Sequence, residues 1–170
     1  IRGQVTRAAG PAFERMLAAA GASIASMPSA EIYTAMQTGV LDAANTSSAS
    51  FMSYRIYEHT ECLTAPGEHA LWFMYEPVMI AERRWDRLND AQRTAILNAG
   101  QVAEDYFFEE AKQLDTTMED VFSDAGVEVV QMSQEQAEVW RKIALETSYK
   151  AFADNVPGGG LLIEQALAVE

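Results

Sequence analysis

Apolar residues in the first quarter of the chain follow two periodicities in turn, one of two residues and one of about 3.6. Strands are predicted at residues 4–8, 23–27 and 40–44, where short apolar runs fit the strand period. Helices are predicted between them, at residues 11–20 and 29–38, because apolar side chains recur there every three or four residues and a glycine follows each run. Strands that alternate with helices over short connections predict an α/β layer with parallel strands.

The middle of the chain is less regular. A helix is predicted to start in the small hydroxyl and amide residues 45–53 and to reach about Tyr57, since Ser and Thr are good N-caps. Strands are predicted at residues 62–65 and 71–80. One or two helical turns are expected at residues 82–88.

The second half has a different pattern, dominated by helix. Apolar residues recur every three or four positions from Asp90 to Asp124, which predicts one helix about 50 Å long. A helix of this length indicates a spine, a coiled coil or a bridge between two lobes. A strand at residues 127–132, a helix at residues 133–155 and a last short helix at residues 161–169 follow, with a flexible glycine-rich break at residues 157–160.

Charge and cysteine content narrow the classes of function. The chain of 170 residues has 12 Lys and Arg against 25 Asp and Glu, a formal net charge of −13, and 49% hydrophobic residues. These values fit a globular domain, and an acidic surface repels phosphate backbones, so no nucleic-acid partner is expected. Cys62 is the single cysteine, which excludes an internal disulfide. It has no basic neighbour in sequence, and we expect a buried, inert thiol.

The sequence contains no recognisable catalytic constellation. His59 and His69 share no helical spacing and are expected on the surface or in loops; a metal cluster with nearby glutamates is the lesser alternative. The glycine run at residues 158–160 lacks the spacing and the lysine of a phosphate-binding loop. The serines at residues 47–50 lack a nucleophile elbow. We therefore expect no catalytic residue, no resident metal and no cofactor.

One passage of the first half resembles a known family. Residues 31–42 read EIYTAMQTGVLD, after GA at residues 21–22 and MP at residues 27–28. This order is similar to the "GA…PMPFSEVYTALQTGVID" passage of DctP-type solute-binding subunits of tripartite ATP-independent periplasmic (TRAP) transporters. A later element is also similar and contains Trp85, Leu88 and Gln92.

The resemblance implies a fold of the type II periplasmic binding protein kind: two α/β lobes bridged by a long helix, with the N-terminal portion missing from this chain. Residues 1–60 would belong mainly to the second lobe, residues 61–88 would hold crossing strands, and residues 89–125 would form the spine. Residues 126–170 would add a C-terminal strand and helices. The chain opens without an initiator Met or a signal peptide, so we expect a piece of a longer, periplasmic protein.

The resemblance also implies a ligand site in the cleft between the lobes. The arginine that holds a ligand carboxylate in the family falls on Arg7. The planar fork of arginine can bond both oxygens of a carboxylate at once, which lysine cannot do. Taken without the resemblance, Arg7 would be a surface arginine at the end of a strand.

Three positions depart from the family pattern, and two further residues complete the expected site. Ser29 replaces an aromatic residue that would pack on the ligand. Asn45 stands where a carboxylate often sits, which argues against cation-assisted binding, and Thr46 stands where Asn or Trp contacts the ligand. Ser47 is expected beside them, and Phe73, from its register, would supply an aromatic wall.

The function implied by the resemblance is capture of a small organic acid in the periplasm and delivery to TRAP membrane permease subunits. A ligand-sensing or interaction protein on the same fold, not coupled to transport, is the alternative. The long helix is also a candidate interface for a homodimer. A metal-dependent enzyme is the third hypothesis.

Overall fold

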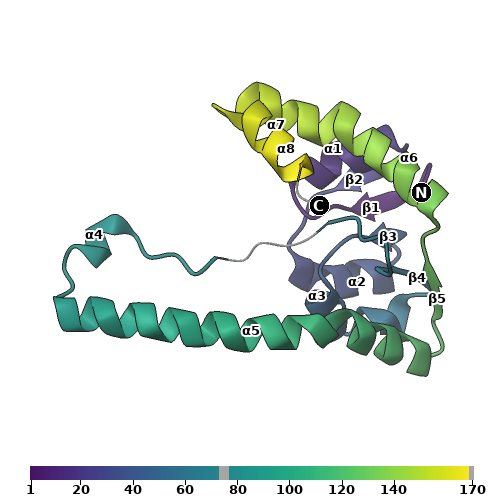
Figure 1. Cartoon of the computed structure of the whole chain (residues 1–170). Helices are drawn as coiled ribbons and strands as arrows, with labels where there is room; N and C mark the ends of the chain where they lie inside the picture. The colour runs from purple at the N-terminus through teal and green to yellow at the C-terminus, as the bar shows by residue number, and fades with distance from the viewer. Residues whose placement is uncertain (73–76, 169–170) are drawn as a thin grey trace.

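The computed structural model describes residues 1–72 and 77–168, and it confirms an α/β architecture with parallel strands (Figure 1). The strands form two small sheets. In the first sheet β1 lies between β2 and β3, and in the second β4 pairs with β5; every pair is parallel. The strand bounds are β1 Val5–Arg7, β2 Ser23–Ala25, β3 Ala43–Ala44, β4 Cys62–Ala65 and β5 Glu128–Gln131.

The helices of the first half lie where the apolar periodicity predicts them. α1 spans Pro11–Ala19, and a 3-10 turn η1 (Ser29–Glu31) leads into α2 (Ile32–Gln37). The helix expected to reach Tyr57 is shorter: α3 covers Ser48–Ser53, and a separate 3-10 helix η2 covers Ile56–His59. The break falls at Arg55, whose φ of 55° is left-handed and cannot continue a right-handed helix.

The three-stranded sheet is covered by helices on both faces (Figure 1). On one face Ile32 from α2 is fully buried and packs with Leu41, Ile56 and the sheet residue Val5. On the other face the buried residues Met16 and Leu17 from α1 pack with Ala8, Ile24 and Trp140. A parallel sheet needs apolar partners on both faces, and the alternation of side chains along each strand supplies them.

α5 confirms the long helix predicted from Asp90 to Asp124. Asn89 caps it, with Gln92 completing a capping box. The N-terminal half of α5 projects away from the sheets, and α4 (Glu82–Trp85) lies beside its first turn (Figure 1). Arg93 Nε donates to the Trp85 carbonyl at 3.3 Å and fixes that end.

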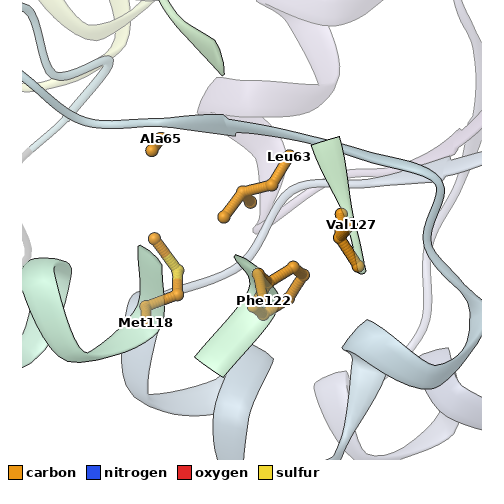
Figure 2. Packing of buried hydrophobic residues seen from close by; sticks show 5 residues of the cluster. All are labelled: Leu63, Ala65, Met118, Phe122 and Val127. Atoms are coloured by element: carbon orange, nitrogen blue, oxygen red, sulfur yellow. The ribbon is translucent and has the colours of Figure 1, made fainter. Parts of the chain in front are cut away.

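The C-terminal half of α5 closes a second hydrophobic core under β4 and β5. Phe122 is fully buried and lies with Met118 on α5 against Leu63 and Ala65 of β4 and against Val127 (Figure 2). The rings of Phe51 and Tyr57 meet Phe122 edge-on, each at 5.8 Å between centroids. This core attaches the second sheet to the helices of the first half.

Two further expectations from the sequence are not met in the described residues. Residues 71–72 and 77–80 contain no strand, and residues 73–76 lie outside the described residues. Pro77 has no N–H to donate to a ladder, and Val78 and Met79 are exposed. Cys62 is exposed rather than buried, because burial alternates along β4 and places Leu63 and Ala65, not Cys62, on the core face.

The C-terminal helices complete the layer over α1. α6 (Gln134–Ala144), a π-helical segment η3 (Leu145–Tyr149) and α7 (Lys150–Asn155) form the continuous helix predicted at residues 133–155. α8 (Gly159–Leu167) begins earlier than expected, so two of the glycines assigned to a flexible break are helical. Ser148 Oγ donates to the Ala12 carbonyl at 2.6 Å and ties η3 to α1.

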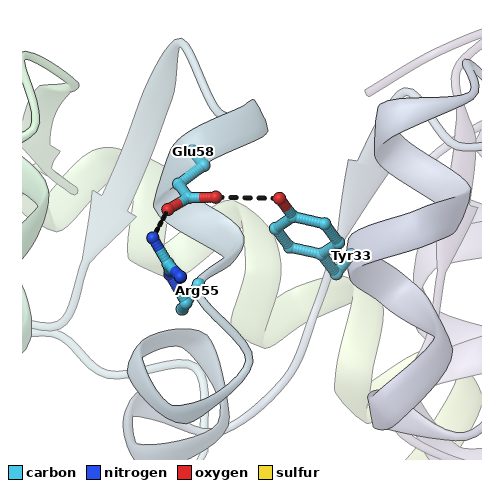
Figure 3. Close-up of polar contacts among 3 residues, drawn as sticks. All are labelled: Tyr33, Arg55 and Glu58. Carbon is cyan, nitrogen blue, oxygen red and sulfur yellow. Dashed lines mark hydrogen bonds and ion pairs between the residues drawn. The ribbon is translucent and has the colours of Figure 1, made fainter.

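A polar cluster joins α2 to η2. Glu58 accepts a hydrogen bond from Tyr33 Oη at 2.8 Å and pairs with Arg55 (Figure 3). The Tyr33 hydrogen bond and the Arg55 charge lower the pKa of Glu58, and the hydrogen bond to Glu58 raises the pKa of Tyr33. The two shifts express one interaction, which is strongest while Glu58 is ionised.

Among residues 1–72 and 77–168, no helix is both long enough and apolar enough to cross a lipid bilayer.

Phe122→Ala is expected to lower the free energy of unfolding of the full-length protein by about 3–5 kcal/mol, because it opens a cavity where three aromatic rings meet. Urea unfolding followed by circular dichroism measures the change. Leu161→Ala on α8 is the control; its side chain is 60% exposed, and a change within about 0.5 kcal/mol is expected. A loss below about 1 kcal/mol for Phe122→Ala would contradict the packing described.

Tyr33→Phe is expected to destabilise the protein at neutral pH and to have no effect in acid. The pKa of Glu58 is lower in the folded state, so its interaction stabilises above the ordinary value of 4.5 and is lost as pH falls through the lower, folded value. The difference in Tm between wild type and variant, measured across this range, should shrink toward zero. Tyr54→Phe, an exposed tyrosine beside Arg55, is the control, and a pH-independent difference for Tyr33→Phe would exclude the interaction.

Candidate functional site

The carboxyl ends of the three parallel strands meet at one edge of the first sheet. Strand pairing aligns Arg7, the last residue of β1, with Ala25 of β2 and Ala44 of β3. The residues that follow β2 and β3 therefore lie next to Arg7 although they are far from it in sequence. In open α/β sheets this edge faces the ligand crevice.

Two backbone carbonyls hold the Arg7 guanidinium. Nε donates to the Met27 carbonyl at 3.1 Å, and Nη1 donates to the Asn45 carbonyl at 2.7 Å. These bonds use two of the five N–H groups of the guanidinium and leave one on Nη1 and two on Nη2. No carboxylate of the described residues lies in ion-pair range of Arg7. The free end of the fork has the geometry for a bidentate bond to a carboxylate.

Partial burial affects the pKa of the Arg7 guanidinium. Loss of solvent lowers the pKa of Arg7 below its usual value, since burial disfavours the charged form. The guanidinium nevertheless stays protonated at physiological pH. Arg7 is therefore a fixed, half-desolvated cation for which an anion would be a favourable partner.

Asn45 is held on three sides. Its N–H donates to the Arg7 carbonyl at 2.9 Å, its carbonyl accepts from Arg7, and its Oδ1 accepts from the Ala9 N–H at 3.4 Å. A carboxylate at this position would add a negative charge next to the guanidinium and compete with an anionic ligand. The neutral amide leaves the positive charge of Arg7 available.

Thr46 and Ser47 follow Asn45 and connect it to the start of α3. Thr46 is only 7% exposed. Ser47 Oγ accepts from the Ser50 N–H at 3.3 Å as the N-cap of α3, and it donates to Ser50 Oγ at 3.0 Å. The Ser47 hydroxyl thus stabilises the start of α3, and direct contact of Thr46 or Ser47 with a ligand stays a prediction.

Two residues predicted for the site remain, Ser29 and Phe73. Ser29 opens η1, half-buried, two residues beyond the Met27 carbonyl that holds Arg7. Phe73 lies outside the described residues. Arg7 and Asn45 are therefore the predicted residues that the structure brings into direct contact.

A depression of about 1350 Å³ lies beside this edge, and Asn45, Thr46 and Ser47 line it. Aromatic side chains from three distant parts of the chain also line it: Trp72, Phe107 and Trp140. Trp72 lines the depression and also packs against α1, because its ring meets that of Phe13 edge-on at 4.9 Å. Many polar side chains line it as well, among them the serines of residues 47–53 and Asp115.

Sequence reasoning missed several residues of this region. The role of the Met27 carbonyl depends on the order of strands in the sheet, which a single sequence does not show. Phe107, Asp115 and Trp140 also line the depression, from α5 and α6. Their spacing within each helix carries no signal for a site.

The histidines form no evident reaction centre. The ring of His59 lies 4.5 Å from that of Tyr33, and its Nε2 is buried with no hydrogen-bond partner among the described residues. Across residues 1–72 and 77–168 no group of three or more His, Cys, Asp or Glu side chains has an arrangement that could hold a metal ion.

Comparison with known proteins gives consistent matches. The sequence profile of DctP, the bacterial extracellular solute-binding protein family 7, matches residues 1–155. A solute-binding protein of Albidiferax ferrireducens is 37% identical over 165 residues, which cover 97% of this chain and 49% of that protein. The chain thus spans about half the length of this relative.

Solved structures of other proteins also match this chain. The crystal structure of a TRAP periplasmic solute-binding protein from Rhodoferax ferrireducens with bound malonate is 37% identical, with a TM-score of 0.91 over 98% of this chain and 54% of that one. A TRAP solute-binding protein from Desulfovibrio salexigens with bound orotic acid has a TM-score of 0.80 at 22% identity, over 96% of this chain and 52% of that one. The second likeness concerns the fold alone.

Proposed function

Because the chain belongs to the bacterial extracellular solute-binding protein family 7 (DctP), we propose that it is part of a periplasmic protein that captures a small organic acid and delivers it to a TRAP-type membrane permease. One observation carries the proposal. Arg7 is held by two backbone carbonyls at a sheet edge, and the free end of its fork has no carboxylate partner among the described residues. The proposed role is binding, with no bond made or broken.

The chemistry of Arg7 favours a carboxylate over a neutral ligand. A half-buried cation has lost part of its hydration, and a carboxylate that bonds Nη1 and Nη2 together replaces it. A neutral analogue would leave the cation unpaired, which selects against such ligands. The relative from Rhodoferax ferrireducens holds malonate, a dicarboxylate, which supports this ligand class.

The surface of α5 supports a site completed by a second half of the protein. Leu97, Val102 and Phe108 are 64%, 69% and 62% exposed on the projecting part of this helix. An apolar surface of this kind marks a place where another protein segment packs. We propose that the half of the protein that this chain does not span covers it, and that the two halves close around the ligand.

Substitution of Arg7 tests the proposed function. Arg7→Ala in the full-length protein is expected to weaken binding of a carboxylate such as malonate at least about 30-fold, since loss of one partner of a buried charge pair costs about 2–5 kcal/mol. Arg7→Lys should restore binding only in part. Lysine has three N–H donors, too few for two backbone carbonyls and two ligand oxygens at once. Isothermal titration calorimetry on the three proteins measures the affinities.

Arg15→Ala is the matched control, because Arg15 is exposed on α1 and its guanidinium contacts only the neighbouring Pro11 carbonyl among the described residues. It should bind like wild type. Circular dichroism and Tm confirm that each variant is folded. Equal affinities of wild type and Arg7→Ala would remove Arg7 from the site and remove the reason to expect an acid.

The 170-residue chain alone is expected to self-associate and to bind acids poorly. The exposed apolar part of α5 would then pack against other copies, and the cleft would lack one wall. Multi-angle light scattering measures the mass, and Leu97→Glu with Phe108→Glu should shift it toward the monomer. A clean monomer of the unsubstituted chain with micromolar affinity for malonate would contradict both expectations.

A further inference from the structure

α3, the short helix that follows the Asn45 segment, depends on α5 for its position. It has six residues, and an isolated helix of this length is unstable in water because nucleation is costly. Contacts outside the helix must therefore hold it. Part of this support comes from η2 and from the apolar cluster around Ile56, against which Phe51 packs. Two further contacts come from one face of α5, at Asp115 and at Phe122.

The first contact is polar and lies at the start of α3. Ser48 Oγ donates to Asp115 Oδ1 at 2.5 Å, across 67 positions in sequence. Ser48 and Asp115 both line the depression that Asn45 also lines. The bond therefore fixes the first turn of α3 at the wall of the candidate site.

The second contact is apolar and lies one turn further along. Phe51 meets the fully buried Phe122 ring edge-on at 5.8 Å. Asp115 and Phe122 are two turns apart on α5, and Ser48 and Phe51 are one turn apart on α3, so each pair shares a face of its helix. α3 thus lies along α5, with a hydrogen bond at its start and a ring contact inside it.

The start of α3 is coupled to Arg7 through three residues. Ser47 caps α3 with its side chain, and Thr46 is buried, which leaves the intervening backbone little freedom. The Asn45 carbonyl then accepts from Arg7 Nη1 at 2.7 Å. A shift of Ser48 would therefore move the acceptor that orients the guanidinium.

We propose that Asp115 on α5 is a positioning residue for the ligand site, which acts through Ser48 and the Asn45 segment on the orientation of Arg7. The ligand part of this inference rests on the proposed function. Asp115 touches no ligand in this scheme. It makes the affinity at the sheet edge depend on a residue of the long helix.

The experiment uses four variants of the full-length protein: Asp115→Ala, Asp115→Asn, Ser48→Ala and the double alanine variant. The first readout is hydrogen–deuterium exchange at residues 47–51, and the second is malonate affinity by calorimetry. Asp120→Ala is the control: Asp120 is exposed on α5, as Asp115 is, but its side chain makes no hydrogen bond or ion pair among the described residues.

Asp115→Ala and Ser48→Ala are each expected to speed exchange at residues 47–51 and to weaken malonate binding about fivefold, the size of one net hydrogen bond. The double variant should be no worse than either single variant, since both remove the same bond. Asp115→Asn keeps an acceptor oxygen and should restore both readouts. A loss of overall stability without a positioning role would show as equal exchange changes throughout the protein.

The outcomes separate this inference from the proposed function. Unchanged exchange at residues 47–51 in Asp115→Ala overturns the inference whether or not a ligand binds. Faster exchange with wild-type malonate affinity overturns the link from Asp115 to the site. Additive losses in the double variant overturn the shared bond. Failure of the wild-type protein to bind malonate or any other carboxylate counts against the proposed function, while the exchange readout still decides the role of Asp115.

Discussion

Arg7 can be held by the carbonyls of Met27 and Asn45 because β1 lies between two parallel strands that end at the same edge. Parallel pairing carries the chain back to the same end of the sheet each time, so the residues after β2 and β3 converge on the end of β1. An antiparallel neighbour would have placed its turn there instead. The candidate site is a consequence of this topology, and its chemistry comes from the residues found at the convergence.

The residues around the Arg7 guanidinium are held rigidly, and the guanidinium has no carboxylate partner among the described residues. The neutral Asn45 fixes the guanidinium through its backbone carbonyl and adds no competing negative charge. Ser47 caps α3, and Ser48 is bonded to Asp115, so the segment beside the guanidinium is held at both ends. A preorganised donor loses less conformational entropy when a ligand binds than a mobile one does. A small entropy loss on binding matters in this chain, because its net charge of −13 repels anions at long range.

α5 links the parts of the molecule in two ways. Its C-terminal half supplies Met118 and Phe122 to the core under the second sheet, and Asp115 to the site segment. Its N-terminal half leaves apolar residues in solvent. Across the described residues, one helix is thus buried at one end, while its other end is largely exposed and contacts α4 at its first turn. That division fits a chain that spans about half the length of its relatives.

The sequence determined the local elements and the family. The bounds of α5, the helix start at Pro11, the presence of a first strand within residues 4–8 and the passage at residues 31–42 all follow from local periodicity, capping chemistry or a contiguous motif. Only the tertiary structure decided which residues meet. The exposed face of Cys62, the carbonyl of Met27 beside Arg7 and the bond from Ser48 to Asp115 depend on strand order and helix packing between segments far apart in sequence. The left-handed break at Arg55 is also missing from the local pattern. Helix and strand patterns arise from neighbours a few residues apart, whereas a site assembled from distant segments is set by how the whole chain buries its apolar surface.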